Sequence, residues 1–309
     1  MQSPQFQELF LQMIGGDEES FIRNHWRKRI LFTQSAISRE IFDYPYDEFL
    51  NDYKQVKPLN ETLVVSIDDQ GTRRMVRPSD ELTAQHMLDG GASLVLQAFH
   101  LLDSLPNMPE TWRVFRRLHS DLCSYLLPQF PRETHPDAAV AAVDIFCAGE
   151  NTSTGGHYDT GDVFYFVLDG EKEWTLEFEP DPETVLNLFR VNGRYMQDHL
   201  PQREHKTIKI RPGDCLYVPP FTYHRVRSQG RSLAVSIGLP AYTEATLLKQ
   251  VLERLQLERL IWEPLPSYPD RFAQLFQEAE DDTRSRVLAL LDAIKRKITA
   301  TAGTHAPVS

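Results

Sequence analysis

The chain has 309 residues, of which 41% are hydrophobic and 25% are charged, and its formal net charge is −11. This balance is typical of a globular protein and excludes an intrinsically disordered chain, and the acidic charge argues against a nucleic-acid partner. No apolar run approaches the roughly 18 residues of a membrane span, so we expect no membrane partner. The N-terminus lacks the features of a signal peptide, and the three cysteines have no CxxC spacing, which together predict a reducing, cytoplasmic location.

The first part of the chain mixes predicted helices with short predicted strands. Helical spacing of apolar residues, capping residues and turn signals define the elements. In chain order they are short helices within 1–30, a helix from a Ser38 cap to about Tyr53, a hairpin of 63–67 with 73–77, a helix from a Ser79 cap to about Gly90, a strand at 93–99 and a helix at 111–127.

From residue 138 onward, short strands are broken by Gly, Pro and Asp. The predicted strands are 138–148, 162–168, 171–178, 207–211, 215–218, 224–227 and 232–239. Many short strands of this kind favour a jelly roll, the class that includes the cupins. After Pro240, two amphipathic stretches at 247–261 and 287–298 predict helices. We therefore expect a mainly β fold with flanking helices, in which a double-stranded β-helix (jelly-roll or cupin) core joins a helical N-terminal part to a C-terminal helical extension.

Three His-x-Asp triplets occur, and their predicted context separates them. The triplet at 119–121 lies in a predicted helix, where residues i and i+2 point about 200° apart and cannot share a metal ion. The triplet at 135–137 contains a proline in a Pro-rich connection and is typical of a turn. Only His157 and Asp159 open a strand region, where residues i and i+2 project to the same face. That geometry permits joint chelation.

A further histidine, His224, follows a Gly-Asp turn, the apolar strand 215–218 and a Pro-Pro pair. Two imidazoles and one carboxylate form the facial triad that holds iron and leaves positions open for substrates. Each part alone has a simpler explanation, a surface polar pair for His157 and Asp159 and a core or rim histidine for His224. The combination is more specific than any of its parts.

Lys172 is a charge in an otherwise apolar pattern. It follows the hairpin signal Asp169-Gly170, and alternation along 171–178 places it on the same face as Trp174 and Leu176. A buried lysine is costly unless it is paired or hydrogen-bonded. Either its ammonium group reaches solvent at the strand end, or it pairs with an anion inside, such as a co-substrate beside the metal.

From about residue 93 to 240, the chain resembles the JmjC-type Fe(II)- and 2-oxoglutarate-dependent oxygenases of the cupin superfamily. It is most similar to the ribosomal-protein hydroxylases and is also similar to the asparaginyl hydroxylases. The resemblance rests on matched stretches at 157–159, 162–164, 170–174, 213–220, His224 and 236–238, with an N-terminal segment at 21–32. It implies that His157, Asp159 and His224 bind iron and that Lys172 pairs with the distal carboxylate of 2-oxoglutarate. Thr154 and Ser236 are implied to assist Lys172.

Such enzymes use Fe(II), 2-oxoglutarate and O2 to hydroxylate an unactivated C–H bond, with release of succinate and CO2. The resemblance therefore implies a hydroxylase of a protein or peptide side chain. Halogenating relatives replace the ligand carboxylate, so Asp159 favours hydroxylation. Three alternatives stay open: a hydroxylase of a free amino acid, a small metabolite or a peptide natural product; a JmjC demethylase; and a non-catalytic cupin-fold binding protein.

The resemblance also suggests a division of the chain. We expect an N-terminal helical or mixed region at 1–92 that packs on the core, a JmjC/cupin catalytic domain at 93–240, a C-terminal helical region at 241–298 and a flexible tail at 299–309. Ribosomal-protein hydroxylases continue with dimerisation helices and a winged-helix domain. Here the two amphipathic stretches use most of the chain after Pro240, so we expect no complete winged helix. Those helices serve either a homodimer or packing within one chain.

Overall fold

The computed structural model describes most of the chain up to residue 239. The described residues are 4–38, 42–58, 62–67, 73–96, 108–127, 143–159, 161–177, 205–220 and 222–239, with the helical positions 285, 288 and 292. The chain divides into two compact units, Met1–Leu126 with Asp137–Pro240 and Leu127–Pro136 with Ala241–Ser309. The predicted C-terminal helices lie outside the described residues except at 288 and 292, and the tail lies wholly outside them.

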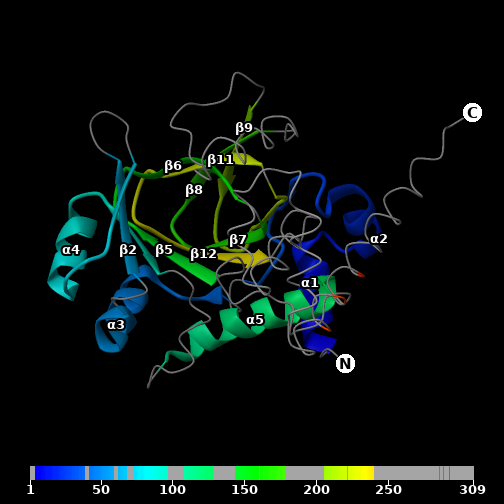
Figure 1. Cartoon of the computed structure of the whole chain (residues 1–309), viewed down its shortest axis with the longest axis horizontal. Coiled ribbons are helices and arrows are strands. Elements are labelled where there is room, and N and C mark those ends of the chain that lie inside the picture. The colour runs from blue at the N-terminus through cyan, green and yellow to red at the C-terminus, as the bar shows by residue number, and fades with distance from the viewer. Residues whose placement is uncertain are drawn as a thin grey trace, which may run out of the picture. The chain divides into compact units, whose positions relative to one another are not determined.

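Two antiparallel sheets form the core of the first unit (Figure 1). The eight-stranded sheet has the order β1-β10-β7-β12-β5-β4-β2-β3, and the four-stranded sheet has the order β6-β11-β8-β9. The strands of the large sheet are β1 (Leu31–Thr33), β2 (Thr62–Ile67), β3 (Arg73–Val76), β4 (Ser93–Leu96), β5 (Val143–Ala148), β7 (Asp162–Asp169), β10 (Cys215–Val218) and β12 (Ser232–Leu239). Those of the small sheet are β6 (Thr152–Tyr158), β8 (Lys172–Glu177), β9 (His205–Ile210) and β11 (Tyr223–Ser228).

The space between the sheets is filled by side chains that alternate along each strand, because successive residues of a strand point to opposite faces. Tyr165 and Leu216 of the large sheet pack in one cluster with Trp174, Leu176 and Val226 of the small sheet. This arrangement is the jelly roll of the cupins. The prediction of a mainly β fold with a jelly-roll core is confirmed, whereas the predicted C-terminal helical extension stays a prediction. Strands β2 and β3 extend the same sheet as β5, so residues on both sides of the expected boundary at 92 and 93 belong to one sheet.

The outer face of the large sheet is covered by helices. Helix α5 (Glu110–Leu126) contacts β5 and β12 (Figure 1). Its apolar residues recur at helical spacing and are buried as predicted: Trp112, Phe115, Leu118, Leu122 and Leu126. Helix α1 (Pro4–Met13) contributes Phe10 to the helix-facing core, and the π-helical turn η1 (Phe21–His25) contributes Phe21. The short helix α2 (Glu18–Ser20) between them has no buried residue. Among the described residues, no helix is both long and apolar enough to cross a bilayer.

Two predicted helix starts were wrong. Helix α3 (Tyr46–Val56) begins after Pro45, not at Ser38, because proline disfavours helical geometry in the residue before it. Helix α4 (Glu81–Asp89) is capped by Asp80, whose carboxylate accepts a hydrogen bond from the Thr83 amide at 2.7 Å. Ser79 was the expected cap, one residue too early. The three-residue strand β1 was not predicted, since it is too short to show alternation.

A network of buried hydrogen bonds connects the N-terminal segment to the start of β7. Arg27 Nε donates to Asp162 Oδ2 at 3.1 Å, and the Tyr217 hydroxyl donates to Asp162 Oδ1 at 2.6 Å. The Arg27 amide donates in turn to the Tyr217 hydroxyl at 2.7 Å. Burial raises the pKa of Asp162 to about 6 despite the favourable charge of Arg27. This network holds the backbone at Asp162, three residues after Asp159.

Candidate metal centre

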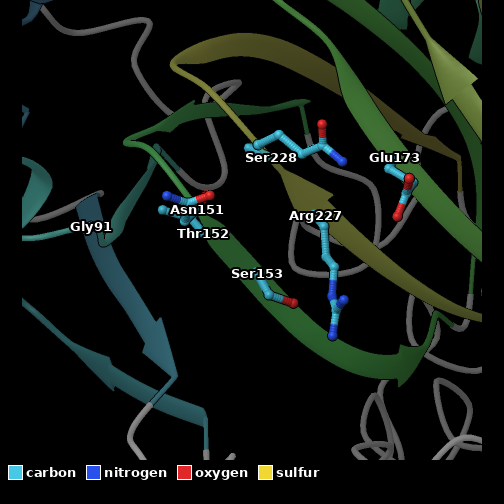
Figure 2. Close-up of a pocket in the computed structure, with 8 residues that line it drawn as sticks. Gly91, Asn151, Thr152, Ser153, Glu173, Arg227 and Ser228 are labelled. Atoms are coloured by element: carbon cyan, nitrogen blue, oxygen red, sulfur yellow. The ribbon is translucent and has the colours of Figure 1, made fainter.

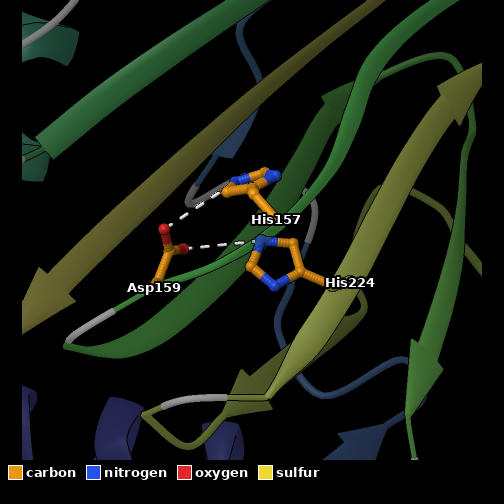
Figure 3. Close-up of side chains that lie close together, drawn as sticks. All are labelled: His157, Asp159 and His224. Carbon is orange, nitrogen blue, oxygen red and sulfur yellow. Dashed lines mark ion pairs between the residues drawn. The ribbon is translucent and has the colours of Figure 1, made fainter. Parts of the chain in front are cut away.

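Two neighbouring strands of the small sheet bring the predicted ligands together. His157 on β6 lies directly opposite His224 on β11, and Asp159 follows the end of β6 (Figure 3). Asp159 Oδ1 is 3.7 Å from His157 Nε2, and Asp159 Oδ2 is 3.5 Å from His224 Nε2. One ligand atom from each residue lies within 4.8 Å of the others, and this is the group of three potential ligands found among the described residues.

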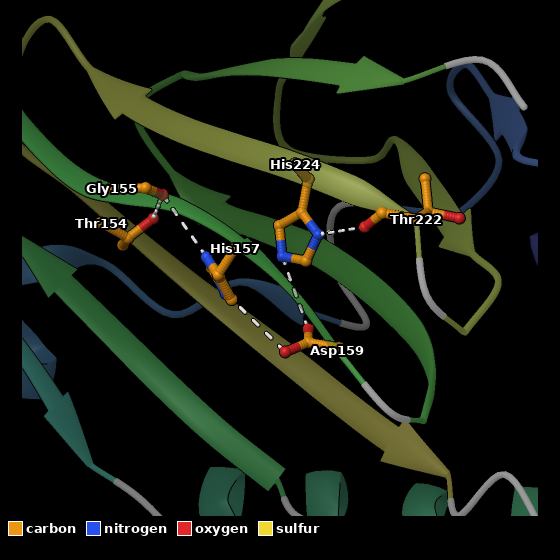
Figure 4. A network of polar contacts seen from close by, with 6 residues as sticks. All are labelled: Thr154, Gly155, His157, Asp159, Thr222 and His224. Atoms are coloured by element: carbon orange, nitrogen blue, oxygen red, sulfur yellow. Dashed lines mark hydrogen bonds and ion pairs between the residues drawn. The ribbon is translucent and has the colours of Figure 1, made fainter. Parts of the chain in front are cut away.

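Backbone carbonyls orient both imidazoles (Figure 4). Nδ1 of His224 donates to the Thr222 carbonyl at 3.0 Å, and Nδ1 of His157 donates to the Gly155 carbonyl at 3.4 Å. A ring that donates from Nδ1 keeps the lone pair of its neutral form on Nε2, which is the form that binds metal. Both Nε2 atoms face the Asp159 carboxylate, so the donor set fits a divalent cation of the Fe(II) type.

A β-bulge in β6 lies at Thr154 and Gly155, one regularly paired residue before His157. The pairing of β6 with β11 shifts between Arg225 and Arg227, and Gly155 adopts a φ of 76°. A bulge places an extra residue on one strand and re-aims the side chains next to it. The left-handed φ favours glycine at this position, and the carbonyl of that same glycine orients His157.

The candidate metal site has one buried side and one open side. The side chain of His224 is 3% exposed, whereas that of Asp159 is 42% exposed. Trp174 of β8 stacks on the His224 ring with 5.0 Å between centroids, and Tyr165 of β7 contacts Trp174 edge-on at 4.6 Å. These aromatic rings cover His224 from behind, so the open side of the site is the side of Asp159.

Lys172 lies inside the barrel, as its strand pattern predicted. Its side chain is buried, and Nζ donates to the Ser228 hydroxyl at 2.8 Å. Among the residues that the structure describes, no carboxylate lies within ion-pairing distance of Nζ. Burial lowers the pKa of Lys172 to about 7. A buried cation without an anion is costly, which makes this group a candidate anion anchor.

The two predicted assisting hydroxyls lie elsewhere. Thr154 is in the β6 bulge and donates to the Gly155 carbonyl at 3.5 Å (Figure 4), next to the acceptor of His157. Ser236 is half-buried on β12 and pairs with Asp144 of β5 and Tyr165 of β7. All three lie in the large sheet, whereas Lys172 lies in the small one. Neither is hydrogen-bonded to Lys172. Instead Ser228 contacts Lys172, and Ser232 donates to Ser228 at 3.0 Å.

The sequence analysis missed Ser228 and Ser232. Alternation along β11 from His224 through Val226 to Ser228 could have placed Ser228 on the inward face. The triplet at 119–121 lies in α5, as predicted, and His119 Nε2 is 3.5 Å from Cys123 Sγ. The triplet at 135–137 lies outside the described residues, and its role as a turn stays a prediction.

A polar cavity of about 450 Å³ opens at the end of the small sheet where Lys172 lies (Figure 2). Its lining joins the turn after α4 to the ends of β6 and β11 and to β8. The lining residues are Gly91, Asn151, Thr152, Ser153, Glu173, Arg227, Ser228 and Gln229. Ser228 is thus common to the cavity wall and to the hydrogen bonds around Lys172.

The jelly-roll core and its paired His-Asp-His set define a cupin-type protein with a facial triad. Residues 129–247 match the family model described as JmjC domain. This part of the chain is therefore similar to the JmjC domain, and the chain is similar in sequence to a ribosomal oxygenase.

Two curated relatives are similar in sequence. A probable ribosomal oxygenase of Haemophilus influenzae is 22% identical over 229 residues, which cover 72% of this chain and 49% of the relative. A bifunctional lysine-specific demethylase and histidyl-hydroxylase NO66 of Dictyostelium discoideum is 29% identical over 136 residues, which cover 43% of this chain and 25% of the relative. The chain therefore spans about half the length of the first relative and a quarter of the second.

Solved structures share the fold. The ribosomal oxygenase YcfD of Escherichia coli, in complex with cobalt and 2-oxoglutarate, superposes with a TM-score of 0.54 at 17% identity, covering 87% of this chain and 69% of that chain. The same protein in complex with cobalt and succinic acid gives a TM-score of 0.52 over the same share of each chain. These matches confirm the jelly-roll fold.

Proposed function

We propose that the chain is an Fe(II)- and 2-oxoglutarate-dependent oxygenase that hydroxylates a C–H bond of a protein or peptide side chain. One observation carries the proposal: the His157–Asp159–His224 set lies at the inner face of the same small sheet as the buried ammonium of Lys172, which has no carboxylate partner among the described residues. A metal site alone would fit many functions. A metal site with an anion anchor inside the same barrel fits a co-substrate that is both a chelator and a carboxylate.

Each side chain has a separate task in this proposal. His157, Asp159 and His224 would hold Fe(II), and the bound iron with 2-oxoglutarate and O2 supplies the oxidising chemistry. Lys172 would hold the distal carboxylate by a charge-assisted hydrogen bond. Trp174 closes the site behind His224, so the reacting side is the one on which Asp159 is exposed.

A polypeptide substrate fits this exposure. Asp159 is 42% exposed, so a side chain presented from outside can reach the metal without a closed small-molecule pocket. The YcfD structures and the Haemophilus influenzae protein carry the description ribosomal oxygenase, which favours a protein substrate. The description of the Dictyostelium discoideum relative as both demethylase and hydroxylase favours N-demethylation as the second candidate.

The co-substrate assignment is tested by succinate formation. The wild-type protein, incubated with Fe(II), ascorbate, 2-oxoglutarate and O2, is expected to form succinate. Asp159→Ala is expected to lose metal binding and turnover, because one of three ligands is gone. Lys172→Ala is expected to retain metal binding but to lose turnover at least a hundredfold, since the carboxylate loses its charged partner.

Lys209→Ala is the matched control. Lys209 lies on the neighbouring strand β9 but is exposed and pairs with Glu171, so its removal should leave turnover unchanged. Normal succinate formation by Lys172→Ala would overturn the co-substrate assignment. Mass spectrometry of a cell extract treated with wild-type or Asp159→Ala protein identifies the product class. A peptide heavier by one oxygen atom supports hydroxylation, whereas loss of a methyl group with formaldehyde release supports demethylation.

A further inference from the structure

We infer that Ser228 is a direct ligand of the co-substrate, donating its hydroxyl proton to the distal carboxylate that Lys172 binds. The inference rests on the proposed function and extends it to a residue that neither strand pattern nor resemblance had selected. The distal carboxylate would then accept two hydrogen bonds, one from the charged ammonium of Lys172 and one from the neutral hydroxyl of Ser228.

The first support is the number of hydrogen bonds that a hydroxyl can form. A serine hydroxyl has one proton to donate and two lone pairs that accept. Both lone pairs of Ser228 are occupied, by Lys172 Nζ at 2.8 Å and by the Ser232 hydroxyl at 3.0 Å. An ammonium group can only donate, so Ser228 cannot direct its proton toward a charged Lys172. Among the described residues, the structure gives that proton no acceptor.

Burial makes this uncommitted proton significant. Ser228 is 3% exposed, and Lys172 and Ser232 are 2% and 0% exposed. A buried donor without an acceptor costs free energy, and buried polar groups are hydrogen-bonded in the large majority of cases. The same site contains a cation that has no anionic partner in the part of the chain that the structure describes. One carboxylate beside Lys172 would satisfy both groups, because it accepts several hydrogen bonds and carries the missing charge.

Strand geometry gives the ligand its shape. Along the inner face of β11, the order is His224, Val226 and Ser228, and Trp174 of β8 pairs with Val226. Four residues along a strand place Ser228 roughly 13 Å from His224 at the backbone, and both side chains shorten that gap. The site therefore has a metal-binding end, an apolar middle of Trp174 and Val226, and a cationic, hydroxyl-donating end. A 2-oxo dicarboxylic acid has matching groups in the same order.

Ser228 also borders the outer polar cavity (Figure 2). A proton directed into that cavity would meet water there and would contribute nothing to co-substrate binding. The two arrangements differ in one measurable property, which is the dependence of dicarboxylate affinity on the Ser228 hydroxyl.

The test is binding of 2-oxoglutarate to the Mn(II)-loaded protein without O2, measured by calorimetry, together with the KM and kcat for succinate formation. For Ser228→Ala we expect Kd and KM to rise about tenfold or more, as for loss of a hydrogen bond to a charged group. The Mn(II) affinity and kcat should change little. Ser228→Thr keeps the hydroxyl and should bind nearly as the wild type does. Ser228→Cys, a similar-sized and weaker donor, should fall between and serves if the alanine variant folds poorly.

A second ligand isolates the carboxylate. 2-Oxopentanoate has the same chain length but lacks the distal carboxylate, so its weaker binding should be unaffected by Ser228→Ala. The preference for 2-oxoglutarate over 2-oxopentanoate should therefore fall by the same factor as the affinity for 2-oxoglutarate. Wild-type affinity of both Ser228→Ala and Ser228→Cys for 2-oxoglutarate would overturn the inference and leave the proposed function intact. Failure of the Mn(II)-loaded wild type to bind 2-oxoglutarate would instead overturn the proposed function.

Discussion

Lys172 is a buried basic side chain inside the barrel. Its ammonium group is buried and has a hydroxyl as its hydrogen-bond partner. Burial lowers its pKa from 10.5 to about 7. Below pH 7 the charged lysine therefore costs folding free energy in full, and this cost is relieved as pH rises from about 7 towards 10.5. A bound carboxylate would reverse the shift, because an opposite charge favours the ammonium form.

This reversal predicts a pH-dependent affinity. Binding of 2-oxoglutarate should take up a proton at Lys172, so its Kd should rise by up to tenfold per pH unit above about pH 7. The nearby thiol of Cys147 stays neutral in this range, since burial raises its pKa to about 12. Lys172→Arg keeps its charge throughout and should show a flat profile. The measurement is calorimetric titration of the Mn(II)-loaded protein from pH 7 to 9. Parallel profiles for wild type and Lys172→Arg would contradict the prediction.

At the scale of residues, strand alternation predicted a great deal. It selected His157 with Asp159 and turned Lys172 inward, while His224 was selected by its place after the strand 215–218 and the Pro-Pro pair. The structure brings the three candidate ligands together and buries Lys172, although His157 lies near the end of β6 and Asp159 follows that end, where a strand had been expected to begin. The roles of all four stay predictions. The partner of Lys172 could not be predicted, because Ser228 is selected by the cross-strand pairing of β8 with β11, and pairing is not visible in a single strand.

Among the elements, β6 has the strongest link to the site. Its bulge contains Gly155 with a φ of 76°, and the Gly155 carbonyl accepts the hydrogen bond that orients His157. Backbone strain at this point would therefore affect both folding and the ligand.

We predict that Gly155→Ala destabilises the fold by about 1–2 kcal/mol, the cost of a left-handed φ for a residue with a Cβ. It should also weaken Mn(II) binding, because the carbonyl that orients His157 shifts with the strain. Urea unfolding and metal titration measure the two effects. Gly230→Ala is the control, since its Cβ would meet no atom within 4 Å and its φ is not left-handed. Equal behaviour of the two variants would refute the link between bulge and ligand.

Elements with long periodic patterns were predicted well, and short or locally capped ones were not. Helix α5 has an apolar residue at each turn and was placed to within one residue. The starts of α3 and α4 depend on Pro45 and Asp80, where neighbouring polar residues offer competing caps. Strand β1 is defined by its pairing with β10, a contact between residues far apart in the chain.

For the whole molecule, the site links ligand binding to folding. The three ligands come from segments that meet only in the folded sheet, so an unfolded chain offers no equivalent site. A metal ion at about 100 times its Kd should therefore add about 2.7 kcal/mol to the free energy of unfolding.

We predict two successive increments in the melting temperature. Mn(II) should raise it, and 2-oxoglutarate should raise it further only when Mn(II) is present, because the co-substrate chelates the metal. Lys172→Ala should retain the first increment and lose most of the second, whereas Asp159→Ala should lose both. Differential scanning calorimetry of the three proteins checks this order. A 2-oxoglutarate increment without metal would mean that the dicarboxylate binds elsewhere.

The bulge in β6 has a consequence for the tolerance of the chain to insertions and deletions. From the His157–His224 pair to the Thr152–Ser228 pair, the chain takes five steps along β6 but four along β11, so the bulge accommodates one extra residue of β6. Deletion of one bulged residue would leave four steps on each strand and would preserve both pairings. Insertion of one residue would need a second bulge, and without one it would turn the side chains of one half of β6 outward. The register of the site should therefore survive a deletion at the bulge better than an insertion.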